Sequence, residues 1–203
     1  LRRWKGFVAD PPASVDLTRW APSPGYQGWV NSCGSWAVAY TALGWYQRKD
    51  LVAGGPLAPM YIYAQIVRGY NIGTSLEQNF DIAARQGVDT LADYGPGGYY
   101  DYTTQPTDAQ RANATNWKLS SWRAIPVDAN SIKASLAAQH PVVLGMNAYS
   151  NFMTLTSSEH GLYRAAGGQV VGGHAVTALG YDATGVRIEN SWGTGWGDGG
   201  FAT

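Results

Sequence analysis

Residues 190–197 read Asn-Ser-Trp-Gly-Thr-Gly-Trp-Gly, and this run is the strongest signal of fold in the chain. It follows a strand-like segment, residues 186–189, and its repeated glycines are typical of a loop at a strand end. Another strand-like segment, residues 175–181, precedes it. Pairing of the two segments as a hairpin would bring His174, at the start of one strand, next to Asn190, at the end of the other.

Cys33 is the only cysteine, so no intrachain disulfide is possible. A lone thiol is either a small buried apolar group or a nucleophile, and a nucleophile needs a histidine and an Asn or Asp elsewhere. Asn31 and Ser32 offer N-cap chemistry just before Cys33, which predicts a buried helix over residues 33–49. The positive end of that helix would lower the pKa of the thiol.

These residues supply the parts of an acyl-transfer site. Cys33 would attack as the thiolate, His174 would be its proton partner, and Asn190 would hold the imidazole in place. Gln27 precedes Cys33 by six residues, so its side-chain amide can stabilise an oxyanion beside the Cys33 N–H. The expected catalytic residues are Cys33, His174, Asn190 and Gln27.

The first half of the chain reads mainly helical and the second half mainly β. Further helices are expected over residues 58–68, from Ser75 to Gly87 and over residues 131–139, and a third strand over residues 142–146. Ser75 and Gln78 have the spacing of a capping box. This order predicts an α+β fold with a helical lobe over about residues 25–105. A β-rich lobe over about residues 106–203 would also include the N-terminal segment.

The composition argues against several classes of function. Lys plus Arg number 14, as do Asp plus Glu, so the net charge of zero gives no electrostatic reason to expect nucleic acid as a partner. No apolar run approaches the roughly 20 residues of a membrane span. The acidic residues show no metal-ligand spacing, and we expect neither a metal nor another cofactor.

The chain resembles the papain family of cysteine peptidases. The matching residues occur in the family's order, namely Gln27, Cys33, His174 and Asn190. His174 follows Cys33 by about 140 residues, within the roughly 130–150 of that family, and the run at residues 190–197 is among its most specific signatures. The resemblance extends more weakly from about residue 15 to residue 201. It implies a single papain-like domain over residues 1–203, with a cleft between a helical lobe and an antiparallel, β-barrel-like lobe.

The resemblance also implies contacts with a substrate. Trp192 would shield the His174–Asn190 hydrogen bond from water, and Trp196 would help form the leaving-group side of the cleft. The groups expected against the substrate backbone are Asn31, Gly73, Thr74 and the carbonyl of Gly173. The pocket for the substrate side chain second from the scissile bond would involve Ser75, Leu76, Gly145, Met146 and Gly172.

The nucleophile region departs from the family pattern. The family usually reads Cys-Gly-Ser-Cys-Trp-Ala, whereas residues 31–37 read Asn-Ser-Cys-Gly-Ser-Trp-Ala. Matching Trp36 to the family tryptophan would put Ser35 at the nucleophile position. Anchoring on Gln27 puts Cys33 there instead, with Gly34 in place of the tryptophan. We favour the second register because its Gln-to-Cys spacing needs no insertion, and because Ser-Cys followed by small residues resembles the bacterial branch.

The leading hypothesis is a secreted, bacterial-type cysteine endopeptidase that hydrolyses peptide bonds of proteins through a thioester acyl-enzyme. It would be a monomer that acts on protein or peptide substrates and is made as a zymogen with an inhibitory pro-segment. Two alternatives stay open: an inactive homologue that serves as a binding module, and a Cys–His amidase or transpeptidase. Because family members normally continue past Thr203, we expect either a short version or a truncated sequence.

Overall fold

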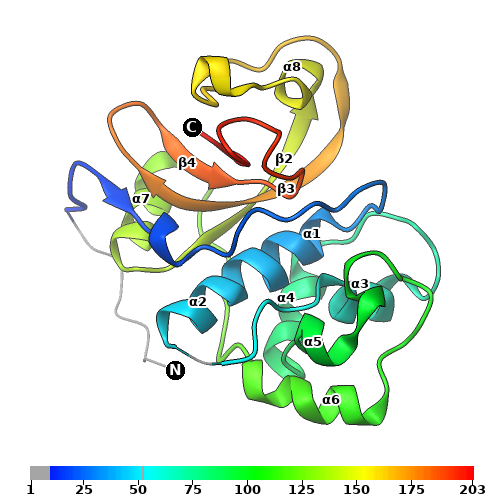
Figure 1. Cartoon of the computed structure of the whole chain (residues 1–203). Helices are drawn as coiled ribbons and strands as arrows, with labels where there is room; N and C mark the ends of the chain where they lie inside the picture. Colours follow the sequence, from blue (N-terminus) through cyan, green and yellow to red (C-terminus); the bar gives the residue numbers. More distant parts are fainter. Residues whose placement is uncertain (1–9, 52) are drawn as a thin grey trace.

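The computed structural model describes residues 10–51 and 53–203 (Figure 1), so residues 1–9 of the expected domain lie outside the described residues. The helices are α1 (Cys33–Ser35), α2 (Gly44–Lys49), α3 (Pro59–Val67), α4 (Leu76–Arg85), α5 (Leu91–Tyr94), α6 (Asp108–Ala114), α7 (Ala129–Ala137) and α8 (Ser150–Met153). The 3₁₀-helices are η1 (Thr18–Trp20), η3 (Pro96–Tyr99), η4 (Thr115–Trp117) and η5 (Ser157–Glu159). The π-helix is η2 (Trp36–Leu43). The strands are β1 (Val15–Asp16), β2 (Val142–Tyr149), β3 (Val170–Tyr181), β4 (Val186–Glu189) and β5 (Phe201–Ala202).

One continuous helix, formed by α1, η2 and α2, runs through the middle of the molecule between the sheet and the helices α3–α6 (Figure 1). It covers the predicted residues 33–49, and every residue of η2 is buried. Its middle part, η2, is wound as a π-helix. The predicted side-chain cap is wrong, because the buried Ser32 hydroxyl donates to the carbonyl of Val30 and caps nothing.

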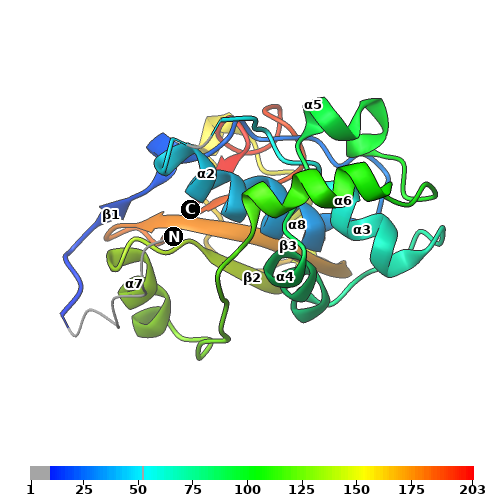
Figure 2. The ribbon, with the colours of Figure 1, turned by 90° about the horizontal axis from the view of Figure 1, so that it is seen from below.

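The sheet is antiparallel and is organised around its longest strand, β3. Strands β1 and β2 pair with one edge of β3, β4 pairs with the other edge, and β5 pairs with β4. Among the described residues the sheet is open, so the expected barrel-like closure is absent: β5 has only two residues and pairs with no strand beyond β4. Helix α7 lies beside the sheet, apart from the other helices (Figure 2).

Local signals located most of the long elements correctly. Helix α3 has Pro59 at its first position, and the Ser75–Gln78 capping box at the start of α4 is present in both directions. Strand β4 has the predicted bounds, whereas β2 and β3 are longer than predicted. The division into lobes stays a prediction, but Ala114 at the end of α6 belongs to the apolar cluster of the helical side, beyond the expected boundary near residue 105.

Two buried hydroxyl groups join the central helix to the sheet. The hydroxyl of Thr177 on β3 donates to the carbonyl of Ala37 at 2.9 Å, and the hydroxyl of Thr41 donates to the carboxyl of Glu189 on β4 at 2.9 Å. Thr177 is fully buried and Thr41 nearly so. Buried hydrogen bonds of this kind fix how the helix lies on the sheet, because any sliding would leave their polar groups unpaired.

We expect Thr177→Val to lower the free energy of unfolding by about 1–2 kcal/mol, because the isosteric valine removes the hydroxyl that donates to Ala37. Thr177→Ser keeps that donor and is the matched control. Urea denaturation of both variants measures the difference. A valine variant as stable as the serine variant would show that this bond does not hold the helix on the sheet.

Candidate active site

Cys33 is the first residue of α1 and is partly buried where the central helix meets β3. Burial raises the pKa of the Cys33 thiol above its ordinary value. Hydrogen bonding with the backbone of Ala175, Gly34 and Cys33 itself acts in the opposite direction. The contact with Ala175 places the thiol against the residue that follows His174, so the helix and the strand bring the two predicted partners into one site.

The β3–β4 pairing joins His174 to Asn190 as predicted. The imidazole Nε2 lies 2.7 Å from the side-chain oxygen Oδ1 of Asn190. That oxygen also accepts a hydrogen bond from the backbone N–H of Ser191, which fixes the amide. A proton on Nε2 satisfies the contact with Asn190 and leaves Nδ1 as the basic nitrogen of the ring.

The imidazole is covered by aromatic rings. The ring of Trp192 stacks on His174 with centroids 4.4 Å apart, and Phe152 lies 6.2 Å away. Burial lowers the pKa of His174, and the hydrogen bond to Asn190 partly opposes that effect. Trp196 is only 6% exposed, and its indole N–H donates to the carbonyl of Phe152. Trp196 packs edge-on against Trp192 with ring centroids 5.6 Å apart, and its part in the leaving-group side of the cleft stays a prediction.

Gln27 is held against the loop that follows Asn190. Its side-chain Oε1 accepts a hydrogen bond from the Ser191 hydroxyl at 2.7 Å, and its backbone N–H donates to the carbonyl of Ser191. The amide Nε2 donates one hydrogen to the carbonyl of Val30 at 2.8 Å. Because an amide nitrogen carries two hydrogens, one donor of Gln27 is left for a ligand.

Ser35 and Cys33 face different parts of the molecule. Ser35 is fully buried, and its hydroxyl donates to Oδ1 of Asn79 on α4 at 2.5 Å. Residues two apart on a helix point about 200° apart, so one turn cannot present both side chains to β3. This geometry supports the register in which Cys33, and not Ser35, lies beside His174.

The other expected substrate contacts lie around Cys33 in the helical side and in β3. Asn31 and Gly73 are exposed, as is Gly173, and a β-carbon at either glycine would meet open space. The Thr74 hydroxyl accepts a hydrogen bond from Asn79, so its side chain is directed into the protein. The exposed surface at Gly73 and Gly173 is therefore backbone.

The expected side-chain pocket is brought together only in part. A β-carbon at Gly145 on β2 would lie 3.6 Å from a methyl group of Leu76 on α4, so these two elements face each other. Met146 lines a different hollow, because neighbouring residues of a strand point to opposite faces. Ser75 is occupied as the cap of α4.

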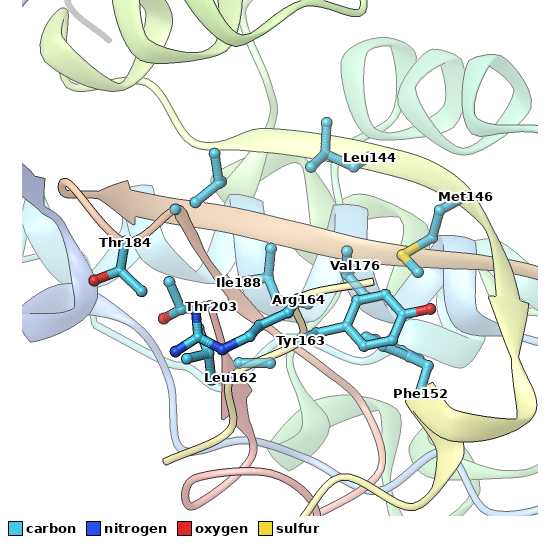
Figure 3. Close-up of a pocket in the computed structure, with 13 residues that line it drawn as sticks. Leu144, Met146, Phe152, Leu162, Tyr163, Arg164, Val176, Thr184, Ile188 and Thr203 are labelled. Carbon is cyan, nitrogen blue, oxygen red and sulfur yellow. The ribbon is translucent and has the colours of Figure 1, made fainter. Parts of the chain in front are cut away.

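That hollow lies against the sheet and has a volume of about 390 Å³ (Figure 3). Its lining is mainly apolar and includes Met146, Phe152, Tyr163, Arg164, Val176 and Ile188. Neither Cys33 nor His174 lines it, although two residues of its lining lie next to His174: Phe152 packs near the imidazole ring and Met146 is the partner of His174 across β2 and β3. The candidate chemistry therefore lies outside this hollow.

Comparison with known proteins identifies the family of the chain. A model described as papain family cysteine protease matches residues 67–203, more than half of the chain. The chain belongs to the papain family. The matched residues include His174 and Asn190, whereas Cys33 precedes them, so its place in the site rests on the structure.

Relatives within the papain family are similar over part of the chain. A gut-specific cysteine proteinase of Caenorhabditis elegans is 34% identical over 82 residues, which covers 38% of this chain and 24% of the relative. A cathepsin B-like protein of Giardia intestinalis is 41% identical over 80 residues, which covers 37% and 26%. The chain thus matches about a quarter of the length of these two relatives.

Solved structures confirm the papain-like fold. Xylellain, a cysteine protease from Xylella fastidiosa, superimposes with a TM-score of 0.82 at 25% identity, covering 96% of this chain and 80% of that one. Digestive procathepsin L 3 of Tenebrio molitor has a TM-score of 0.77 at 20% identity, covering 99% and 66%. The second likeness shows the fold alone.

Sequence reasoning missed a buried carboxyl next to the site. Glu189 is 2% exposed and directly precedes Asn190 in the chain. Burial raises its pKa to about 8, and the hydrogen bond from Thr41 and the charge of Arg48 only partly oppose this. Its position at the end of a strand was visible in the sequence, but nothing local signals that this carboxyl is buried.

We expect Glu189→Gln to gain stability relative to the native chain as the pH rises. The folded chain keeps Glu189 protonated up to about pH 8, whereas the unfolded chain ionises it near its ordinary pKa of 4.5. The native chain therefore loses stability between these values, by a few kcal/mol, and glutamine does not. Thermal unfolding from pH 4 to 9 measures the widening difference.

The same change at the exposed Glu77 is the control for this prediction. A difference between Glu189→Gln and the native chain that stays constant from pH 4.5 to 8 would contradict a buried, protonated Glu189.

Proposed function

We propose that the chain is a cysteine peptidase that cleaves peptide bonds with Cys33 as nucleophile, His174 as acid and base, and Asn190 as the residue that orients the imidazole. The observation that carries this proposal is the convergence of Cys33 at a helix start with the 2.7 Å His174–Asn190 contact on the adjoining strand. Membership of the papain family supports it.

Each step follows from the positions of these groups. The Cys33 proton passes to Nδ1 of His174 as the sulfur attacks the substrate carbonyl carbon. The oxyanion that forms is stabilised by the free N–H of Gln27 and by the Cys33 N–H. His174 then protonates the leaving amine, and the carbon–nitrogen bond breaks to give a thioester. Water then attacks the thioester carbon while His174 takes a proton from it. The carbon–sulfur bond breaks, the carboxylic acid leaves, and His174 returns the proton to the sulfur of Cys33.

Burial does not prevent this proton transfer. It disfavours a lone charge on either Cys33 or His174, as their pKa directions show. The transfer creates the two charges together and next to each other, so their attraction offsets much of the lost hydration. The pair then titrates as a unit, with a thiolate–imidazolium form between its two apparent pKa values.

The finer features extend this proposal. We infer action on proteins or peptides by a monomeric, secreted, bacterial-type enzyme held inactive by a pro-segment, and the procathepsin structures among its neighbours support the last point. Within the described residues, no helix is long and apolar enough to cross a membrane. The amidase or transpeptidase alternative uses the same Cys33 and His174, so only the substrate separates it.

We expect iodoacetamide to label Cys33 at pH about 6, where an ordinary thiol of pKa about 8.5 is under about 1% ionised. His174→Ala should lose this labelling and reduce casein hydrolysis by about 10²–10⁴-fold, the usual contribution of a general acid–base group. Mass spectrometry of the alkylated chain and release of soluble casein fragments measure the two effects.

Cys33→Ala and Ser35→Ala separate the two registers in the same assays. We expect Cys33→Ala to abolish hydrolysis and Ser35→Ala to keep the labelling of Cys33. Casein hydrolysis that survives Cys33→Ala would contradict the proposal. Labelling without casein hydrolysis, together with release of fragments from peptidoglycan, would favour the amidase.

A further inference from the structure

Two asparagines contact the chain on either side of Cys33. The Oδ1 atom of Asn71 accepts a hydrogen bond from the backbone N–H of Asn31 at 2.8 Å, two residues before Cys33. The Oδ1 atom of Asn79 accepts one from the hydroxyl of Ser35 at 2.5 Å, two residues after Cys33. The nucleophile segment, residues 31–35, is thus held at both ends by amide side chains, one from α4 and one from the chain before it.

Asn71 and Asn79 also take part in the hydrogen bonds that hold the chain between them. We call residues 71–75 the wall segment, since they lie beside Cys33 and contain the exposed Gly73. At its far end, Nδ2 of Asn79 donates to the Thr74 hydroxyl at 2.8 Å and to the Ser75 carbonyl at 2.7 Å. At its near end, the Asn71 carbonyl accepts from Nδ2 of Asn31 at 3.1 Å.

Asn79 is the stronger of the two anchors. Its side chain is fully buried, and its oxygen and both amide hydrogens have hydrogen-bond partners. A fully paired amide in a site of low dielectric constant is rigid, because losing any partner leaves a buried polar group unpaired. Asn71 is only partly buried, and the Tyr63 hydroxyl steadies it at 3.0 Å.

Gly34, the residue after Cys33, leaves room for the side chains of Asn79 and Thr74. A β-carbon at Gly34 would lie 3.0 Å from Nδ2 of Asn79 and 3.2 Å from Oγ1 of Thr74. Both distances are tighter than ordinary van der Waals contact. The absence of a side chain at Gly34 therefore leaves the space that the Asn79–Thr74 hydrogen bond occupies, which gives a physical reason for this departure from the family pattern.

We propose that Asn79, with Asn71 as a second anchor, is a positioning residue that fixes the wall segment relative to the thiol of Cys33. The inference rests on the proposed function, in which Cys33 is the nucleophile. Neither asparagine touches a reacting atom, and each acts through the segments that it joins. The backbone around Gly73 is accessible, so its distance from the thiol sets where the backbone of a bound peptide lies. A misplacement of about 1 Å can cost about 10²-fold in rate.

The test compares a small reagent, which does not need the wall segment, with a peptide, which does. Asn79→Leu keeps the approximate shape of the side chain and removes all three hydrogen bonds. We expect iodoacetamide to alkylate Cys33 in this variant within about twofold of the native rate. The kcat/KM for an internally quenched peptide should fall roughly 10–100-fold, and its pH profile should not shift, because the Cys33–His174 pair is unchanged.

Asn113→Leu is the matched control, since this partly buried asparagine of α6 donates to the Asp89 carboxylate at 2.7 Å, away from the site. It should lower the thermal stability and leave both rates unchanged. Thr74→Val removes one of the two bonds from Asn79 to the wall segment and keeps the bond to the Ser75 carbonyl and the buried Ser35–Asn79 bond. It should reproduce the loss of peptide hydrolysis in a smaller degree, even if Asn79→Leu does not fold.

Parallel loss of alkylation and peptide hydrolysis in Asn79→Leu and Thr74→Val would overturn the positioning role and leave a structural one. Unchanged peptide hydrolysis in Thr74→Val, or in a folded Asn79→Leu, would also overturn it. A native chain that neither reacts at Cys33 near pH 6 nor cleaves the peptide would instead contradict the proposed function, so the two failures are distinguishable.

Discussion

The contact between the start of the central helix and β3 is the constraint on which the candidate site depends. Cys33 belongs to the helix and His174 to the strand, so neither element could form the site alone. Along β3, alternate residues face the helix, and the Thr177 hydroxyl reaches the carbonyl of Ala37, one turn beyond Cys33. A one-residue slip of β3 would turn the Thr177 side chain to the other face of the sheet. It would also move the backbone of Ala175 away from the Cys33 thiol.

Because Cys33 is the only cysteine, no disulfide holds this contact, and it relies on packing and on hydrogen bonds between distant parts of the sequence. The Gln27–Ser191 and Thr41–Glu189 bonds each join residues more than 140 positions apart. A single bond of this kind contributes a net 0.5–1.5 kcal/mol, roughly. Burial of the apolar clusters supplies most of the stability, and the hydrogen bonds select one arrangement of the helix on the sheet.

The parts of the fold that the sequence predicted are those with local signals. Pro59 marks the start of α3, and the Ser75–Gln78 pair caps α4. Helix α6 was not predicted although Thr107 and Gln110 form an equivalent capping box, because it lies just past the expected lobe boundary near residue 105, where strands are expected. The first residues of β3 were missed because their glycines resemble a loop, and pairing with β2 overrides that local preference.

The candidate site divides in the same way. Motif order and spacing predicted Cys33, His174 and Asn190, and a hairpin was enough to foresee that the last two would meet. The spacing from Gln27 favours Cys33 over Ser35 as the nucleophile, whereas the match to Trp36 favours Ser35, and the helix orientation supports Cys33. Asn79 had no signal, since an asparagine inside an amphipathic helix reads as an ordinary polar residue until its partners Ser35 and Thr74 are known.

Burial favours the neutral form of all three titratable groups here: it raises the pKa of Cys33 and Glu189 and lowers that of His174. Rings of Trp192 and Phe152 pack on His174, so a charge on its imidazole depends on the thiolate of Cys33 that forms beside it. A reaction that moves one proton from Cys33 to His174 keeps the net charge of the pair at zero, so the apolar surroundings tolerate it. Glu189 is paired by a hydrogen bond with the neutral hydroxyl of Thr41, and the charge of Arg48 only partly opposes the effect of burial, which makes it a group for folding and not for proton transfer.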